Sequence, residues 1–148
     1  MSERDWLEEL LERLVDRVNS RDLDGLVDCF ADDYVNETPV HPHRGFRGNA
    51  QVRRNWEQIF ATVPDVRVQV PRKAVRGDTV WTEWEMSGTR TDGGRFHMRG
   101  VVIFQLAGSV ISGARFYLEP VEHISGDIQA AMSRVLGKSA ASDRKEPS

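Results

Sequence analysis

Apolar residues in the first part of the chain recur every three or four positions, the spacing of a helix with one buried face. This spacing predicts more than one helix. We expect the second helix to carry Phe30 on its apolar side and to end at the acidic pair that begins with Asp32. A short strand, Tyr34–Thr38, follows and is stopped by Pro39. The pattern therefore predicts three helices, over residues 5–18, 23–30 and 49–63.

After Pro64 the apolar residues alternate with polar ones, which is the pattern of a strand with one buried face. Gly77 with Asp78 marks one turn, and Asp92-Gly93-Gly94 is a strong hairpin signal. Strands that follow one another through short turns form an antiparallel meander. The predicted strands cover residues 66–75, 79–90, 96–106 and 110–119.

Helices that come first and a meander that follows predict an α+β fold. We expect a cone-shaped barrel in which three N-terminal helices pack on a strongly curved, mostly antiparallel sheet and leave a conical cavity. Apolar residues from Ile124 to Leu136 predict a further helix. We expect residues 1–136 to form a single domain and the polar residues 137–148 to be a disordered tail.

The composition narrows the classes of function. The chain has 148 residues, 29% of them charged, and a net charge of −3, which gives no basic field for nucleic acid or anionic lipid. The single cysteine, Cys29, has no partner for an internal disulfide. No stretch resembles a signal peptide or a membrane span, so we expect a cytoplasmic protein that binds neither nucleic acid nor membrane.

Several segments together resemble the nuclear-transport-factor-2-like (SnoaL-like) superfamily over residues 5–120. They include Phe30-Ala31-Asp32-Asp33, the strand from Arg99 to Leu106, and the ending from Arg115 to Glu119. This superfamily includes ketosteroid isomerases, limonene-epoxide hydrolases, polyketide cyclases and binding proteins. The resemblance implies the cone fold, a pocket for a small hydrophobic molecule, no cofactor, and a homodimer formed through the convex face of the sheet.

The catalytic residues of these enzymes are mostly replaced. The position of the isomerase aspartate, just before Pro39, is occupied by Thr38, which cannot abstract a proton from carbon at neutral pH. Trp84, Met86 and Phe116 occupy the positions of the Arg and the two Asp residues that epoxide hydrolases require. The resemblance therefore argues against epoxide hydrolysis.

Glu37 and His97 are the candidate catalytic residues. A carboxylate in an apolar pocket gains a raised pKa and becomes a usable general base. Alternatively, Glu37 is a rim residue paired with Arg44 or Arg47, and His97 lies on the outer face. The predicted ligand-binding residues are Tyr34, His43, Trp56, Phe60, Trp84, Met86, Arg99, Phe116 and Leu118.

Three hypotheses follow. The first is a protein that binds a small hydrophobic ligand, without an assigned activity. The second is a cofactor-independent isomerase or cyclase-like enzyme with Glu37 as its base. The third is an accessory dimer whose own side chains fill the cone. Trp81, Glu83 and Glu85 share the strand face that we expect to form the dimer contact. His41 and His43 alone do not make a metal site.

Overall fold

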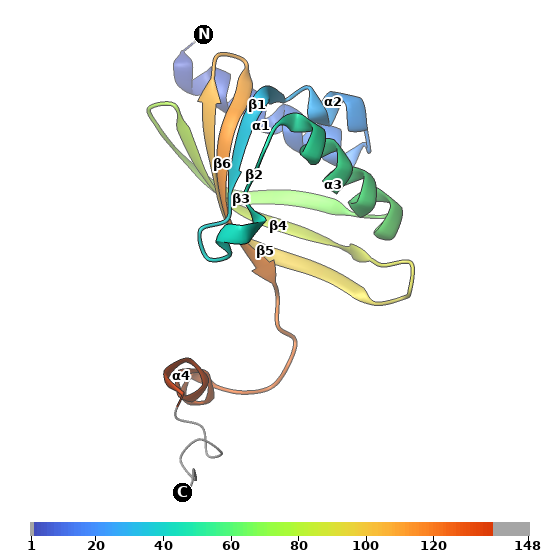
Figure 1. Ribbon diagram of the computed structural model, residues 1–148, viewed down its shortest axis with the longest axis vertical. Helices are drawn as coiled ribbons and strands as arrows, with labels where there is room; N and C mark the ends of the chain where they lie inside the picture. Colours follow the sequence, from blue (N-terminus) through green and yellow to red (C-terminus); the bar gives the residue numbers. More distant parts are fainter. Residues whose placement is uncertain (1, 138–148) are drawn as a thin grey trace, which may run out of the picture.

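The computed structural model describes residues 2–137, in which six strands form one curved sheet (Figure 1). The strand order is β2-β1-β6-β5-β4-β3, and the sheet is not closed into a complete barrel. The neighbouring strands β1 and β6 run parallel, while the other pairs are antiparallel. The strands are β1 (Phe30–Glu37), β2 (Phe46–Arg47), β3 (Arg67–Arg76), β4 (Thr79–Thr89), β5 (Arg95–Ala107) and β6 (Val110–Pro120).

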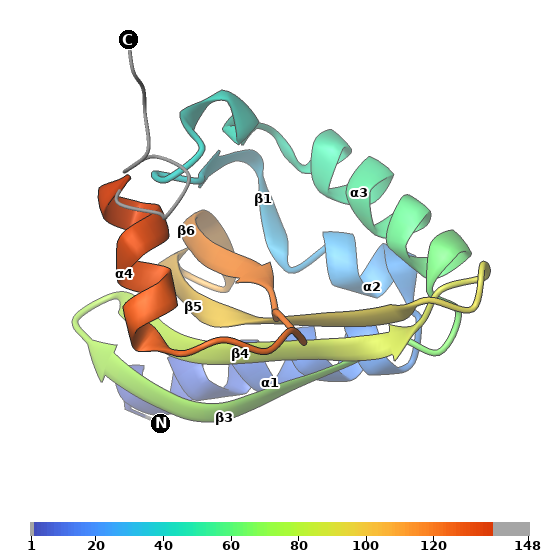
Figure 2. The same cartoon turned by 90° about the horizontal axis from the view of Figure 1, so that it is seen from below.

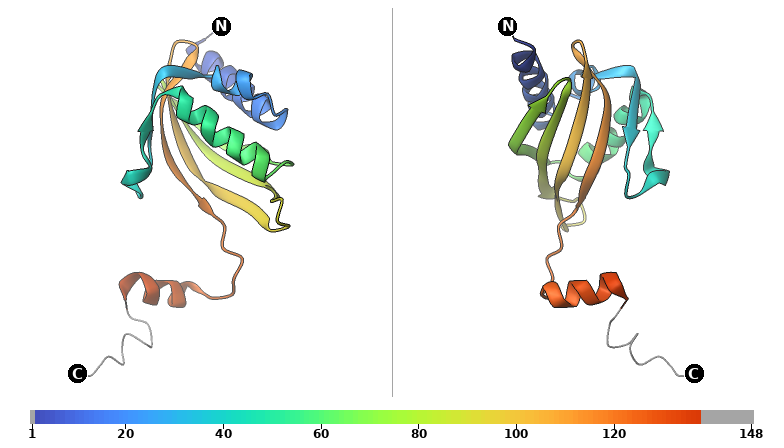
Figure 3. Two further views of the ribbon diagram at one scale, coloured as in Figure 1. Left: turned by 45° about the vertical axis from the view of Figure 1, so that its right-hand side comes forward. Right: turned by 90° about the vertical axis from the view of Figure 1, so that its left-hand side faces the viewer.

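Three N-terminal helices cover one side of this sheet (Figure 3). They are α1 (Glu3–Asn19), α2 (Leu23–Val27) and α3 (Asn49–Thr62). A capping box between Ser2 and Asp5 begins α1, whose leucines are buried in the main core. Figure 2 shows α3 facing β4 and β5 across the interior of the cone. The α+β cone fold predicted from the sequence is confirmed.

Alternation along the long strands gives the sheet two different faces. Trp84 is 5% exposed, whereas Trp81, three positions earlier on β4, is 50% exposed. We call the side toward the helices the concave face, and its residues include Trp84, Met86, Phe96, Met98, Phe116 and Leu118. The opposite side is the convex face, with Trp81, Glu83, Glu85, His97, Arg99 and Tyr117.

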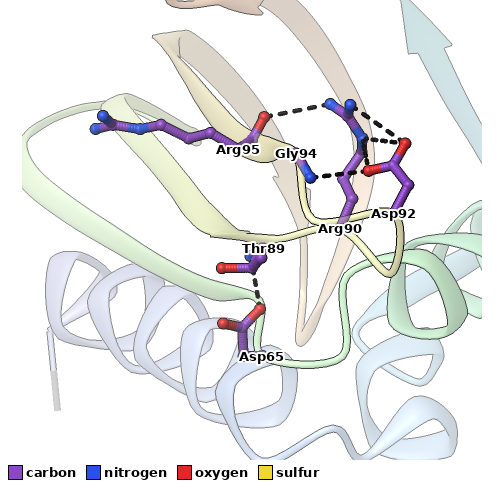
Figure 4. Close-up of polar contacts among 6 residues, drawn as sticks. All are labelled: Asp65, Thr89, Arg90, Asp92, Gly94 and Arg95. Carbon is purple, nitrogen blue, oxygen red and sulfur yellow. Dashed lines mark hydrogen bonds and ion pairs between the residues drawn. The ribbon is translucent and has the colours of Figure 1, made fainter.

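Polar contacts fix the hairpin between β4 and β5 (Figure 4). The backbone N–H of Thr89 donates to Asp65 at 2.7 Å, and that of Gly94 donates to the Asp92 carboxylate at 2.9 Å. The Arg90 guanidinium lies 3.2 Å from the same Asp92 carboxylate. These bonds hold the start of β5, from which Phe96 enters the concave face.

The second helix is shorter than predicted. The second helix ends at Val27, and Phe30 is already the first residue of β1, so the prediction that Phe30 lies on that helix is wrong. The backbone N–H of Cys29 bonds to Leu26, and its carbonyl accepts from Ile111 at 2.8 Å. Because this segment forms hydrogen bonds with β6, it belongs to the sheet, and the helix ends before it.

The last helix, α4, spans Ile128–Leu136 and lies apart from the cone (Figures 1 and 3). Its apolar residues are exposed; Ile128 and Val135 are 75% and 80% accessible. The predicted disordered tail, apart from Gly137, lies outside the described residues. None of the helices in residues 2–137 has the length and apolar run needed to cross a membrane.

Candidate functional site

A cavity of about 360 Å³ lies between the concave face and α3. Alternate residues of β4, β5 and β6 supply one wall, because every second side chain of a strand points to the same side. Aromatic and aliphatic side chains make most of its surface. The lining residues are Leu14, Phe30, Tyr34, Asn36, Thr38, Arg44, Phe46, Val52, Asn55, Trp56, Ile59, Trp84, Met86, Phe96, Met98, Phe104, Phe116 and Leu118.

Six of the nine predicted ligand-binding residues lie in the cavity wall. Phe60 is not among the lining residues; its ring lies 5.6 Å from that of Trp56 and packs against the core. The six are Tyr34, Trp56, Trp84, Met86, Phe116 and Leu118.

The polar part of the cavity comes mainly from β1 and the residue after it. Tyr34 is 1% exposed, and its hydroxyl donates to Oδ1 of Asn36 at 2.7 Å. Asn36 and Thr38 are 8% and 9% exposed and also line the cavity. Burial raises the pKa of Tyr34 far above its usual value of 10.0, so the phenol keeps its proton.

The structure places Glu37 outside this cavity. Its side chain is exposed on the outer face of β1, and its carboxylate lies 3.8 Å from Arg115, which faces it from β6. One sequence-based alternative paired Glu37 with Arg44 or Arg47. The structure pairs it with Arg115 instead. Because Glu37 keeps its contact with water, the geometry gives no support to a general base at this position for chemistry inside the cone.

His97 and Arg99 also point away from the cavity. Phe96 and Met98 are the β5 residues that line it, so His97 and Arg99 lie on the convex face. There His97 is 2.8 Å from Glu85 and 3.2 Å from His123. The His97 hydrogen bond, with the positive charge of nearby Arg99, lowers the pKa of Glu85. This arrangement is a network on the convex surface and does not reach the cavity.

The loop at the mouth contributes a residue other than the predicted one. His43 is exposed in the short 3₁₀ turn Pro42–Arg44 and does not line the cavity, whereas Arg44 does. Arg44 and His41 lie 4.0 and 3.1 Å from the carboxylate of Glu119 at the end of β6. These contacts attach the loop to the sheet at the cavity mouth.

The sequence-based predictions missed the neutral polar residues Asn36, Thr38 and Asn55. A signal for the first two was present in the alternation of β1. If Tyr34 faces inward, residues two and four positions later face inward as well, and Glu37 faces outward. Within residues 2–137, no three His, Cys, Asp or Glu side chains are arranged to hold a metal ion.

Solved structures with the same fold agree with this architecture. A protein of Catenulispora acidiphila with a ketosteroid isomerase-like fold, in complex with trimethylamine, is 17% identical, with a TM-score of 0.64; the match covers 74% of this chain and 85% of that one. A nuclear-transport-factor-2-like protein of unknown function from Exiguobacterium is 20% identical, with a TM-score of 0.63 and coverages of 76% and 98%. A cystatin-fold protein of Novosphingobium aromaticivorans is 22% identical, with a TM-score of 0.60 and coverages of 73% and 94%. Identities this low establish the fold and nothing about activity.

Sequence comparison gives the family. None of the curated proteins matches the chain. The model of the SnoaL-like domain matches residues 11–114, from the middle of α1 to the middle of β6. The match thus covers most of the elements that build the cavity. The chain belongs to the SnoaL-like domain family.

Proposed function

We propose that this SnoaL-like protein binds a small hydrophobic molecule in its conical cavity, without an assigned chemical activity. The observation that carries the proposal is the cavity of about 360 Å³, lined mainly by aromatic and aliphatic side chains with few polar groups. A concave, largely apolar site of this size is typical of small-molecule pockets. The complex of one structural neighbour with trimethylamine supports a ligand-holding role for the fold.

The rival hypothesis of an isomerase or cyclase-like enzyme receives less support. Such chemistry needs an acid or base within reach of the bound substrate. Among the described residues, no Asp, Glu or His lines the cavity, and Glu37 and His97 lie outside it. The accessory-dimer hypothesis requires a cone filled by its own side chains, and the open cavity does not fit that requirement.

Binding of a neutral fluorescent probe, N-phenyl-1-naphthylamine, tests the proposal. Leu118→Trp places a larger side chain at the cavity wall and should weaken probe binding by about 10-fold or more, because the indole occupies space that the probe needs. Tyr117→Trp makes a similar change one residue earlier, on the convex face, and should leave the affinity within about 2-fold. Equal effects of the two variants, or no binding by the unmodified protein, would overturn the proposal.

The homodimer expected from the sequence is part of this proposal. All three N-terminal helices lie on the concave side, so the convex face keeps Trp81 half exposed and Tyr117 37% exposed. A large aromatic on an open sheet face is typical of a protein–protein contact. Sedimentation velocity should show a dimer that Trp81→Glu dissociates, while Trp6→Glu, at an equally exposed tryptophan of α1, leaves it intact. If the unmodified protein sediments as a monomer, the proposed homodimer is wrong.

A further inference from the structure

Two amide side chains in the cavity have their carbonyl oxygens already engaged by the protein. Oδ1 of Asn36 accepts from the Tyr34 hydroxyl at 2.7 Å, and Oδ1 of Asn55 accepts from Nε2 of Gln51 at 2.8 Å. An amide side chain also carries an NH2 group with two donors. Within residues 2–137, neither NH2 group of these two asparagines donates to another protein group. Both residues therefore present hydrogen-bond donors to the cavity.

The orientation of the deeper amide is fixed by its neighbour. Tyr34 is almost fully buried, and burial raises the pKa of its phenol, so the hydroxyl remains a donor at any physiological pH. The hydroxyl donates to Oδ1 of Asn36 at 2.7 Å, which leaves the NH2 group of that amide on the other side. Asn36 itself is buried, with 8% of its surface exposed to solvent. A buried donor without a partner is costly, which favours a ligand that supplies an acceptor.

The charges around the cavity point to the same kind of ligand. Among the described lining residues no side chain is anionic, and Arg44 at the mouth is the cationic one. Glu119 lies 4.0 Å from Arg44 in an exposed pair, so part of this positive charge is balanced at the mouth. A carboxylate buried beside Asn36 would accept from uncharged amide and hydroxyl donors there and would lose its hydration. A neutral oxygen acceptor meets the same donors at a much smaller desolvation cost.

We propose that the ligand is a neutral, mainly apolar molecule with a carbonyl-type oxygen, which accepts from the Asn36 NH2 group and lies beside the Thr38 hydroxyl. This inference rests on the proposed function, because it specifies the ligand of the same cavity. The aromatic walls hold the apolar part, and the two buried polar side chains at the end of β1 select the oxygen. Asn55, on α3, offers a second donor to a ligand that carries another acceptor.

A matched set of two-ring compounds tests the inference on the full chain. The set consists of 2-acetylnaphthalene, 2-ethylnaphthalene and 2-naphthoate, which share the ring system and differ in the attached group. Isothermal titration calorimetry near neutral pH should give the ketone about 5- to 10-fold tighter binding than the hydrocarbon, the value of one satisfied hydrogen bond. The carboxylate should bind more weakly than the ketone.

Two variants assign the preference to the predicted donors. Asn36→Leu keeps the branched shape of the side chain and should abolish the preference for the ketone, measured as the ratio of the ketone and hydrocarbon affinities within the same variant. Thr38→Val replaces the hydroxyl with a methyl group and should reduce the preference. This second variant keeps the test valid if Asn36→Leu does not fold. Glu37→Gln, between them but on the outer face, is the matched control and should preserve the preference.

Each outcome separates this inference from the proposed function. Equal affinity of the unmodified protein for ketone and hydrocarbon overturns the inference and leaves hydrophobic binding standing. Tightest binding of 2-naphthoate overturns the choice of a neutral ligand. A preference that survives in both Asn36→Leu and Thr38→Val overturns the assignment to these residues. No binding of any compound, nor of N-phenyl-1-naphthylamine, overturns the proposed function itself.

Discussion

The concave and convex faces are built from the same strands, yet they carry different chemistry. On β4, Trp84 and Met86 are buried and line the cavity, whereas Glu83 and Glu85 on the other face pair with charged groups. On β5, Met98 faces the cavity and His97 faces outward. The acidic and histidine side chains of β4 and β5 thus lie on the convex face, and neutral side chains of the same strands line the cone. The ligand selection that we propose therefore rests on shape and hydrogen-bond donors, since none of the described residues that line the cavity is an Asp, Glu or His.

The largest expected difference between the two faces concerns stability. Trp84→Ala should lower the free energy of unfolding by about 3–5 kcal/mol, because the ring is 5% exposed and packs 5.8 Å from the ring of Phe104. Trp81→Ala, on the same strand, should cost less than about 1 kcal/mol in dilute monomeric protein, since half of that residue is already in water. Urea unfolding followed by circular dichroism measures both. Similar losses for the two tryptophans would contradict the assignment of the faces.

A smaller effect is expected at the hydroxyl that orients Asn36. Tyr34→Phe should lower the free energy of unfolding by about 1–2 kcal/mol, because it leaves the buried carbonyl oxygen of Asn36 without its donor at 2.7 Å. The variant should also change the response to alkali. Burial raises the pKa of Tyr34 in the folded state, so its contribution is complete below the unfolded value of 10.0 and is lost progressively as pH rises above it.

Urea midpoints measured from neutral pH to above pH 10 check this behaviour. The buried thiol of Cys29 also has a raised pKa and adds a loss of the same sign above 9.0, but it is present in every variant compared. Tyr34→Phe should therefore flatten the alkaline slope relative to the unmodified protein. Tyr117→Phe, on the convex face, is the control and should retain the slope. An unchanged slope in Tyr34→Phe would show that this phenol does not stay protonated in the folded chain.

The fold was largely predictable from the sequence because its signals are local and repeated. The 3.6-residue period identified α1 and α3, the two-residue period identified the four long strands, and Asp92-Gly93-Gly94 identified a hairpin. The start of β1 was not predictable in this way. Phe30 continues the apolar spacing of α2, and only its pairing with Ile111, far along the chain, makes it a strand residue.

The candidate site was predictable where strand alternation was applied consistently. It gave Trp84, Met86 and Phe116 as inward residues, and all three line the cavity. On β1, Glu37 is the acidic residue nearest Pro39, which makes it the obvious candidate base, but strand alternation places it on the face opposite Tyr34. Tyr34 and Glu37 are three positions apart in one strand, so they cannot both face inward. Which face is inward on β5 depended on the register with β4, which the sequence alone does not specify.

The smallest expected effect concerns the network on the convex face. His97 and Arg99 lower the pKa of Glu85 in the folded state, so its contribution to stability is present above the unfolded value of 4.5 and is lost as pH falls through the folded pKa. Glu85→Gln should therefore reduce the loss of stability on acidification, measured as the change in urea midpoint between neutral and acidic pH. Glu83→Gln is the control, because its carboxylate makes only an exposed pair with Arg72 at 3.7 Å.

Neither variant should change ligand binding if the concave face alone forms the site. A change in ketone affinity with Glu85→Gln would mean that the two faces are coupled through β4, and the separation of binding from surface charge would fail.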